Sequence, residues 1–148
     1  MKLNSLTLIF FIVLSSCFQS CKNYDKNSQT EQILNFVKKK NKDLNLFSCI
    51  LIIPGSGCGG CISQATHFLI SKDLKFEKTL IIFTAIENYK NLKIITGNKI
   101  NKSYIVIDSL NQVYNRLDET SIYPKILVKN DKTWFTKIFE DKDSLNLR

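Results

Sequence analysis

The sequence has few of the residues from which metal sites are built. It contains one histidine, His67, and five cysteines. A structural zinc site normally takes four Cys or His ligands. His67 follows Cys58 by nine positions, and on an ideal helix this separation turns the imidazole away from the Cys58 sulfur. We therefore expect no metal site and interpret His67 as an ordinary helix residue.

Apolar runs long enough to cross a membrane are also missing. The run Leu6–Leu14 near the N-terminus is about nine residues long and follows Met1-Lys2, whereas a membrane-spanning helix needs roughly 20 residues. A basic start, a short apolar core and small residues after it are typical of an export signal. The chain shows no repeats, and the roughly 130 residues left without the signal are enough for one domain.

Acidic residues are fewer than basic ones, 13 against 21, and the formal net charge is +8. The densest basic run, Lys38-Lys39-Lys40 with Lys42, follows an amphipathic segment, where cations complement the dipole at the end of a helix. We interpret these lysines as a solvated face. Export argues against nucleic acid as a partner, and any preference for acidic partners or an anionic membrane surface should depend on salt.

The motif Cys58-Gly59-Gly60-Cys61 follows the apolar run Ile50–Ile53 and opens a segment with helical periodicity. Two intervening residues at the start of a helix bring the two sulfurs close enough to form a disulfide. The unpaired N–H groups and the dipole of the helix favour a thiolate in the first turn. We therefore predict that Cys58 is the nucleophile and that Cys61 resolves a mixed disulfide.

The residues just before the motif favour access to it. Pro54, Gly55, Ser56 and Gly57 break the preceding strand. Glycine leaves room for the backbone of another protein to approach the sulfur of Cys58. The motif is therefore expected to be exposed to other proteins.

The rest of the chain predicts one α/β domain. Ser28 and Glu31 have the spacing of a capping box, which predicts an amphipathic helix from Gln29 to about Lys40. A second helix, Cys58–Ser71, should place Ile62, Ala65 and Leu69 against a sheet. The turn Asn130-Asp131-Lys132 should join the last two strands. The short apolar runs predict strands at Phe47–Ile53, Thr79–Ala85, Tyr104–Ile107, Lys125–Val128 and Thr133–Phe139.

The order of strand, Cys58-Gly59-Gly60-Cys61, helix and later Tyr123-Pro124 before Lys125–Val128 resembles the thioredoxin-like superfamily, over roughly Leu46 to Phe139. The resemblance implies a central mixed β-sheet flanked by helices. It implies that Pro124 is the family's cis-proline and that the backbone at Tyr123 and Pro124, with Gly57 nearby, binds substrate. The terminal helix usual in the family is expected to be short or absent beyond Glu140.

The chain departs from the family in three ways. Gly57 stands where many thioredoxins carry a tryptophan. The strand Phe47–Ile53 holds no carboxylate, although thioredoxins usually bury an acid there to relay a proton from the resolving cysteine. The spacer Gly59-Gly60 supplies neither the stiffness of proline nor the charge of histidine.

The sequence Leu14-Ser15-Ser16-Cys17 resembles the bacterial lipobox, in which the signal is cut before a cysteine that receives the lipid. Cys17 is the expected lipidation site, and Cys21 is the second candidate. We therefore predict a signal peptide over 1–16, a flexible tether over 17–28 and a thioredoxin-like domain over 29–148. The resemblance implies a lipid-anchored protein of the bacterial cell envelope, on the periplasmic or outer-membrane side.

The remaining cysteine, Cys49, lies among Phe47, Ile50 and Leu51. We interpret it as a buried small hydrophobe, the alternative being a third redox thiol. After the export region and the Cys58/Cys61 pair are set aside, no second pair remains for a structural disulfide framework.

These features predict a membrane-tethered thiol–disulfide oxidoreductase without a cofactor. Its expected partners are protein thiols or disulfides of the cell envelope and a membrane redox partner. One alternative is a non-catalytic thioredoxin-like binding lipoprotein in which the Cys58–Cys61 disulfide only staples the loop. A copper-handling protein is a third hypothesis, but the chain has no histidine after His67. A peroxidase is a minor one, since the residues before Cys58 do not match the peroxiredoxin signature.

Overall fold

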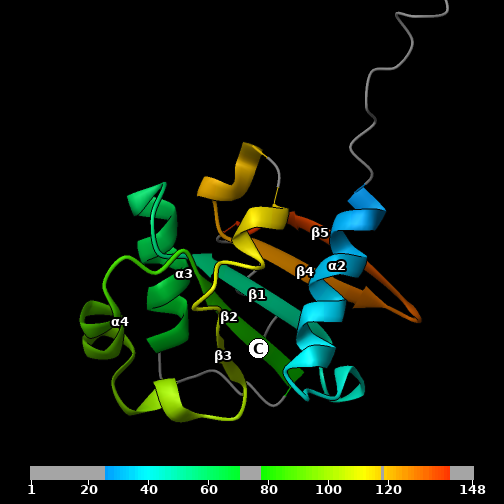
Figure 1. Ribbon diagram of the computed structural model, residues 1–148, viewed down its shortest axis with the longest axis horizontal. Helices are drawn as coiled ribbons and strands as arrows, with labels where there is room; N and C mark the ends of the chain where they lie inside the picture. The colour runs from blue at the N-terminus through cyan, green and yellow to red at the C-terminus, as the bar shows by residue number, and fades with distance from the viewer. Residues whose placement is uncertain (1–25, 71–77, 118, 141–148) are drawn as a thin grey trace, which may run out of the picture.

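The computed structural model describes residues 26–70, 78–117 and 119–140, which form an α/β domain with a five-stranded sheet (Figure 1). The helices within these ranges are α2 (Lys26–Lys39), α3 (Gly59–Ile70) and α4 (Tyr89–Thr96). The strands are β1 (Cys49–Pro54), β2 (Thr79–Thr84), β3 (Ile105–Ile107), β4 (Lys125–Asn130) and β5 (Thr133–Ile138). The expected fold class, a mixed sheet flanked by helices, is confirmed at this level.

The strands follow the order β3-β2-β1-β4-β5 across the sheet. β1, β2 and β3 run parallel to one another, whereas β4 is antiparallel to β1 and to β5. All residues of β1 and β2 are buried, as expected for strands covered on both faces. The predicted strands are confirmed, with ends that shift by one or two residues.

This topology gives the sheet two distinct ends. The C-terminal end of β1, the N-terminal end of β4 and the C-terminal end of β5 meet at one end, which carries Cys58 and Cys61 and is called the disulfide end. The opposite end carries the turn between β4 and β5 and the last turn of α2. We call it the lysine end, because Lys38, Lys42, Lys129 and Lys132 lie there.

Side chains that alternate along β1 pack into two separate core clusters. Ile50 and Ile52 face α2, whose Ile33, Phe36 and Val37 complete the first cluster. Leu51 and Ile53 face α3 in the second. On α3 the predicted contacts of Ala65 and Leu69 with the sheet are confirmed, Ile62 is partly buried there, and Phe68 joins them.

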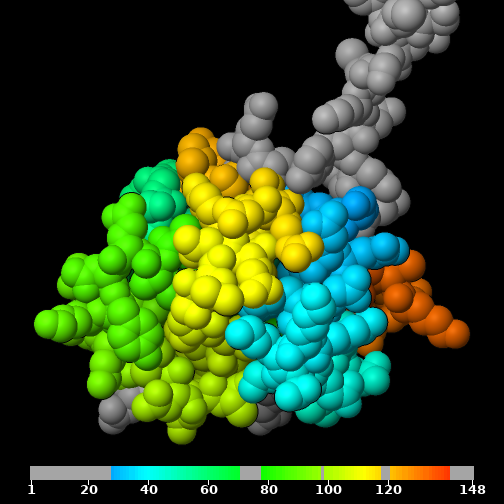
Figure 2. Space-filling view, viewed as in Figure 1, coloured from blue at the N-terminus to red at the C-terminus, as the bar shows by residue number. Residues whose placement is uncertain are grey.

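The segment after β3, yellow in Figure 2, lies beside α2 on the surface of the molecule. Val113 is fully buried in the α2-side cluster. Gln29 donates a hydrogen bond from Nε2 to the Arg116 carbonyl oxygen at 2.9 Å, and Arg116 donates from Nη1 to Oε1 of Gln32 at 3.1 Å. This segment therefore joins the first helix to the end of β3.

The predicted start of the first helix is wrong. α2 already includes Lys26, so Ser28 lies inside the helix, where its Oγ accepts a hydrogen bond from Nε2 of Gln32 at 3.2 Å. The physical reason is that the first turns are held by contacts with the rest of the domain, including one of 2.8 Å between the hydroxyl oxygens of Thr30 and Thr136. The helix thus begins within the segment assigned to the tether.

The expected hairpin is confirmed, because Asn130 pairs with Thr133 across the turn.

The helix α4 was not predicted. Its N-cap is Asn88, whose Oδ1 accepts a hydrogen bond from the Asn91 N–H at 3.1 Å. This is a recognisable start signal.

Several expectations concern residues outside the described ranges. They are the signal peptide, Cys17 and Cys21, most of the tether and the helix expected to be short or absent beyond Glu140. Among the helices of residues 26–70, 78–117 and 119–140, none combines the length and the apolar character needed to span a bilayer.

Candidate functional site

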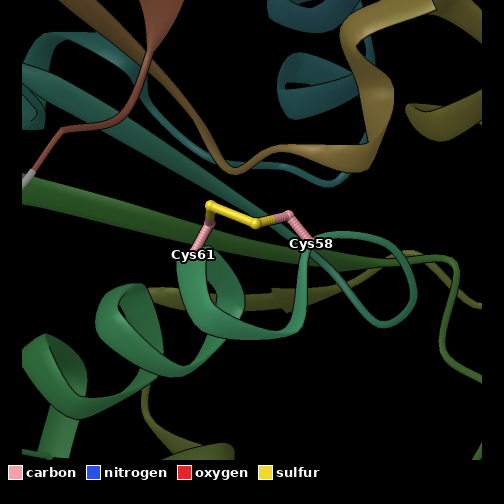
Figure 3. Close-up of a disulfide and its surroundings, with 2 residues drawn as sticks. All are labelled: Cys58 and Cys61. Carbon is pink, nitrogen blue, oxygen red and sulfur yellow. A yellow bond between two sulfur atoms is a disulfide. The ribbon is translucent and has the colours of Figure 1, made fainter.

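Cys58 and Cys61 form a disulfide at the start of α3, with their Cα atoms 5.4 Å apart (Figure 3). Cys58 is the residue just before the helix, and its carbonyl oxygen accepts a hydrogen bond from the Ile62 N–H at 2.9 Å. Cys61 lies in the first turn. Both cysteines are half-buried. The predicted placement of the pair at a helix N-terminus is thus confirmed.

Cys58 occupies the N-cap position of α3. At this position a side-chain acceptor can bind the backbone N–H of the second or third helical residue, and the third here is Cys61. When the disulfide is reduced, a Cys58 thiolate therefore faces the unpaired N–H groups and the positive end of the helix dipole. Reactive cysteines are commonly found in such positions at helix N-termini.

The segment before β4 lies beside the disulfide (Figure 3). The Cys58 N–H donates a hydrogen bond to the Ile122 carbonyl oxygen at 3.0 Å. Tyr123 and Pro124 follow, and the Pro124 carbonyl oxygen accepts a hydrogen bond from the Phe139 N–H at 2.8 Å. Tyr123 and Pro124 therefore follow directly after the residue that is hydrogen-bonded to Cys58.

The expectation of a cis-proline is wrong. No peptide bond within the described ranges is cis, so the Tyr123–Pro124 bond is trans. The trans form of such a bond is favoured by about 0.5–1 kcal/mol. No cis bond is needed here for contact with the motif, because the segment already reaches Cys58 through the Ile122 carbonyl oxygen.

Gly57 is packed directly against this segment. Its φ is +132°, and a Cβ at this position would overlap the Ile122 carbonyl oxygen and lie 2.8 Å from the Ile122 Cα. Few non-glycine residues adopt such a backbone conformation. A tryptophan therefore cannot stand at position 57 unless the segment before β4 moves.

The other glycines near the disulfide differ in how much space a side chain would have. A Cβ on Gly55 would lie 2.8 Å from the Ile86 Cα, so the loop is also packed on the side of β2. Gly59 and Gly60 meet nothing within 4 Å. An added side chain would therefore meet neighbouring backbone at Gly55 or Gly57, whereas it would meet nothing within 4 Å at Gly59 or Gly60.

Asp108 is a buried polar residue that the sequence analysis missed. It follows β3 and is 1% exposed. Its carboxyl oxygens accept hydrogen bonds from Thr84 Oγ1 at 2.8 Å, Gln112 N at 3.0 Å and Val113 N at 2.7 Å. The sequence did contain a signal for this role, because Asp108 directly follows the apolar run Ile105–Ile107 and precedes turn-forming residues. Asp108 fixes the loop after β3, two strands away from β1.

Lys125 is the second residue that was missed. It is 3% exposed and lies opposite Ile52 of β1 in the antiparallel ladder. β1 itself is buried throughout and holds no carboxylate. A buried lysine therefore lies directly after Pro124 and beside the strand that leads to the motif. Lys125 is two residues before Leu127, so both side chains lie on the same face of the sheet, the face that packs against α2.

The remaining titratable candidates lie apart from the disulfide. Cys49 is 1% exposed and packs on the α3 side of the sheet, which confirms its interpretation as a buried residue. His67 is exposed on α3. Burial raises the pKa of Tyr104 above its usual value. Within the described ranges, no three His, Cys, Asp or Glu side chains are grouped so that they could hold a metal ion.

Comparison with known proteins adds nothing to this description. No family model, no curated protein and no solved structure matches the chain. The function therefore has to be inferred from the geometry of the disulfide and its surroundings.

Proposed function

We propose that the protein is a thioredoxin-like thiol–disulfide oxidoreductase that is tethered to the membrane by a lipid on Cys17 and exchanges disulfides with exported proteins. The observation that carries this proposal is the half-buried Cys58–Cys61 disulfide at the N-terminus of α3. A disulfide at a helix N-terminus combines access with a stabilised leaving thiolate, and both properties favour exchange.

The exchange proceeds in two steps. The Cys58 thiolate attacks one sulfur of a substrate disulfide, and the bond between the two substrate sulfurs breaks, which releases one substrate thiolate that takes up a proton. Cys61 loses its proton and attacks the Cys58 sulfur of the mixed disulfide. This step releases the second substrate thiolate, which is protonated in turn. Two electrons pass from the cysteine pair to the substrate, and the reverse sequence oxidises a substrate dithiol.

The arrangement of the sheet supports the thioredoxin-like part of the proposal. A buried strand leads to the motif, α3 follows it, and β4 and β5 form an antiparallel hairpin next to β1. Tyr123 and Pro124 lie beside the disulfide and would offer the backbone on which substrate docks. The Leu14-Ser15-Ser16-Cys17 pattern supports export and lipidation.

A binding lipoprotein with a structural disulfide is the competing function. The apolar character of β1 favours it, because no acid is available in that strand to relay a proton. The size of the disulfide ring argues against it. A loop with so few residues between the cysteines gives only about 2 kcal/mol of stabilisation in the chain-entropy model, less than the roughly 3 kcal/mol of a 15-residue loop.

The decisive experiment is a glutathione-buffered redox titration of the full chain in mild detergent, read by thiol trapping and peptide mass spectrometry. We expect a reversible two-electron transition assigned to Cys58 and Cys61. Cys58→Ser should reduce the rate of exchange with a protein disulfide to the uncatalysed rate, because the attacking thiolate is lost. Cys49→Ala is the matched control and should exchange as the parent does. A pair that stays oxidised throughout would establish the structural disulfide instead.

The lipid anchor has a separate test. Expression in a bacterium followed by mass spectrometry of the mature protein should show an acyl-modified N-terminus at Cys17. Cys17→Ala should lose this modification, whereas Cys21→Ala should keep it. The opposite pattern would move the lipid to Cys21.

A further inference from the structure

We propose that an apolar pocket between α3 and α4 is the specificity site of this exchange reaction and that it binds an aliphatic side chain close to the reactive cysteine of the substrate. This inference rests on the proposed function. It adds the class of substrate, a polypeptide segment in which leucine, isoleucine or valine lies near the cysteine. The two helices that form the pocket pack against one another (Figure 1).

The pocket is continuous with the loop that carries the disulfide. Pro54 and Gly55, which lead into the motif, form part of its wall, and so does Ile62, the residue after Cys61. The Ile62 N–H also donates a hydrogen bond to the Cys58 carbonyl oxygen at 2.9 Å. A chain that presents a cysteine to Cys58 therefore has the pocket within reach of its neighbouring side chains.

The walls of the pocket are fixed by backbone contacts. The Gly55 N–H donates a hydrogen bond to the Thr84 carbonyl oxygen at 2.7 Å, and Gly55 has no space for a side chain beside Ala85 and Ile86. Ala85 has a φ of +50°, and its N–H is held by Oδ1 of Asn111 at 3.0 Å. The two loops that border the pocket thus form a largely rigid frame, as is usual for binding sites.

The chemistry of the lining selects an aliphatic group. Its volume is about 230 Å³, roughly seven or eight times the volume of a water molecule. Ile62, Ile86 and Leu92 line it and are half-buried, and Ile95 remains 49% exposed. Glu87 is the charged residue of the lining. An aliphatic side chain would bury the exposed apolar surface, whereas an acidic one would meet Glu87.

α4 offers a matched pair of isoleucines with which to test the pocket. Ile94 and Ile95 are adjacent, and both are exposed, at 78% and 49%. Ile95 lines the pocket, and Ile94 does not. The same substitution can therefore be made at two adjacent positions of α4, of which only Ile95 lines the pocket.

The test uses the reduced full chain and synthetic peptides that contain an internal disulfide. Leucine, alanine or glutamate is placed in turn at each of the two positions before and after the first cysteine. Reduction of the peptide to its dithiol, coupled to oxidation of Cys58 and Cys61, is followed by chromatography. At one position or more, leucine should raise the rate constant at least about tenfold over alanine, and glutamate should not raise it.

The variants then locate the preference. Ile95→Lys should reduce the advantage of leucine over alanine to less than about threefold. Ile94→Lys, which lies outside the pocket, should keep this advantage and should react with the alanine peptide at the parental rate. The inference is overturned if leucine has no advantage at any position, or if both variants lose it equally. Neither result affects the redox titration of Cys58 and Cys61, so failure of the pocket is distinguishable from failure of the proposed function.

Discussion

At the disulfide end of the sheet the loops are held by backbone contacts, whereas the surface of the lysine end is made of long side chains. Gly57 touches Ile122 at the first end. At the second, Lys38, Lys129 and Lys132 surround a cavity of about 500 Å³, larger than the 230 Å³ of the pocket between α3 and α4. The larger of the two cavities therefore lies at the end away from the disulfide. Cavity size alone therefore does not identify the candidate site, which is marked by the disulfide and by the close backbone contact between Gly57 and Ile122.

Gly57→Ala gives the largest expected effect on stability and tests whether the disulfide end is rigid. The substitution adds a Cβ against the Ile122 backbone at a φ of +132°. Backbone strain of this kind costs about 1–3 kcal/mol, and the overlap adds to it, so we expect the free energy of unfolding to fall by about 3 kcal/mol. Urea unfolding followed by circular dichroism measures the change. A loss below about 0.5 kcal/mol would show that the segment before β4 yields easily.

Asp108→Ala tests the support behind this end. It leaves the buried donors Thr84 Oγ1 and Val113 N without their acceptor, and unsatisfied buried groups cost about 1–3 kcal/mol each. We expect a loss of about 2 kcal/mol in the same unfolding experiment. Asp108→Asn, which keeps one acceptor oxygen, is the control and should lose less. A loss below about 0.5 kcal/mol for Asp108→Ala would mean that these hydrogen bonds contribute little to stability.

Gly59→Ala tests the open spacer between the cysteines. A Cβ there meets nothing within 4 Å, and alanine is favoured over glycine inside a helix by up to about 1 kcal/mol. We expect the free energy of unfolding to rise by about 0.5 kcal/mol in this first helical position, with an unchanged rate of exchange. Destabilisation comparable to that of Gly57→Ala would remove the contrast between the two sides of Cys58.

The smallest effect is expected at the lysine end. Lys38 and Lys132 are exposed, and exposed substitutions usually change stability by less than about 0.5 kcal/mol. The double variant Lys38→Gln/Lys132→Gln should therefore unfold and exchange disulfides like the parent. If exchange with an acidic protein substrate slows and the loss disappears in high salt, the lysines take part in docking.

Much of the sheet could be predicted from the sequence, because strands buried on both faces appear as short apolar runs. Ile50–Ile53 and Leu80–Phe83 are such runs, and both are strands. The Cys58 motif was placed correctly for a related reason: the change from a strand pattern to a helical one is local. Neither inference needed knowledge of contacts between distant residues.

The remaining features depend on contacts between distant residues. α2 begins before Ser28 because Gln29 and Thr30 are bonded to parts of the chain far along the sequence. Pro124 is trans in a segment that is positioned by Cys58 and Phe139. The burial of Lys125 follows from its register with Ile52. Local patterns report intrinsic preferences, and tertiary contacts override them.

The position of the single tryptophan has a consequence for spectroscopy. Trp134 is half-buried at the lysine end, with Lys129 Nζ 5.9 Å from its ring centroid, and the disulfide lies at the other end of the sheet. Tryptophan emission should therefore follow unfolding but change little on reduction of Cys58 and Cys61. One optical signal can then measure the stability of both redox forms. The difference between the two free energies of unfolding equals the difference in the free energy of disulfide formation between the folded and the unfolded chain.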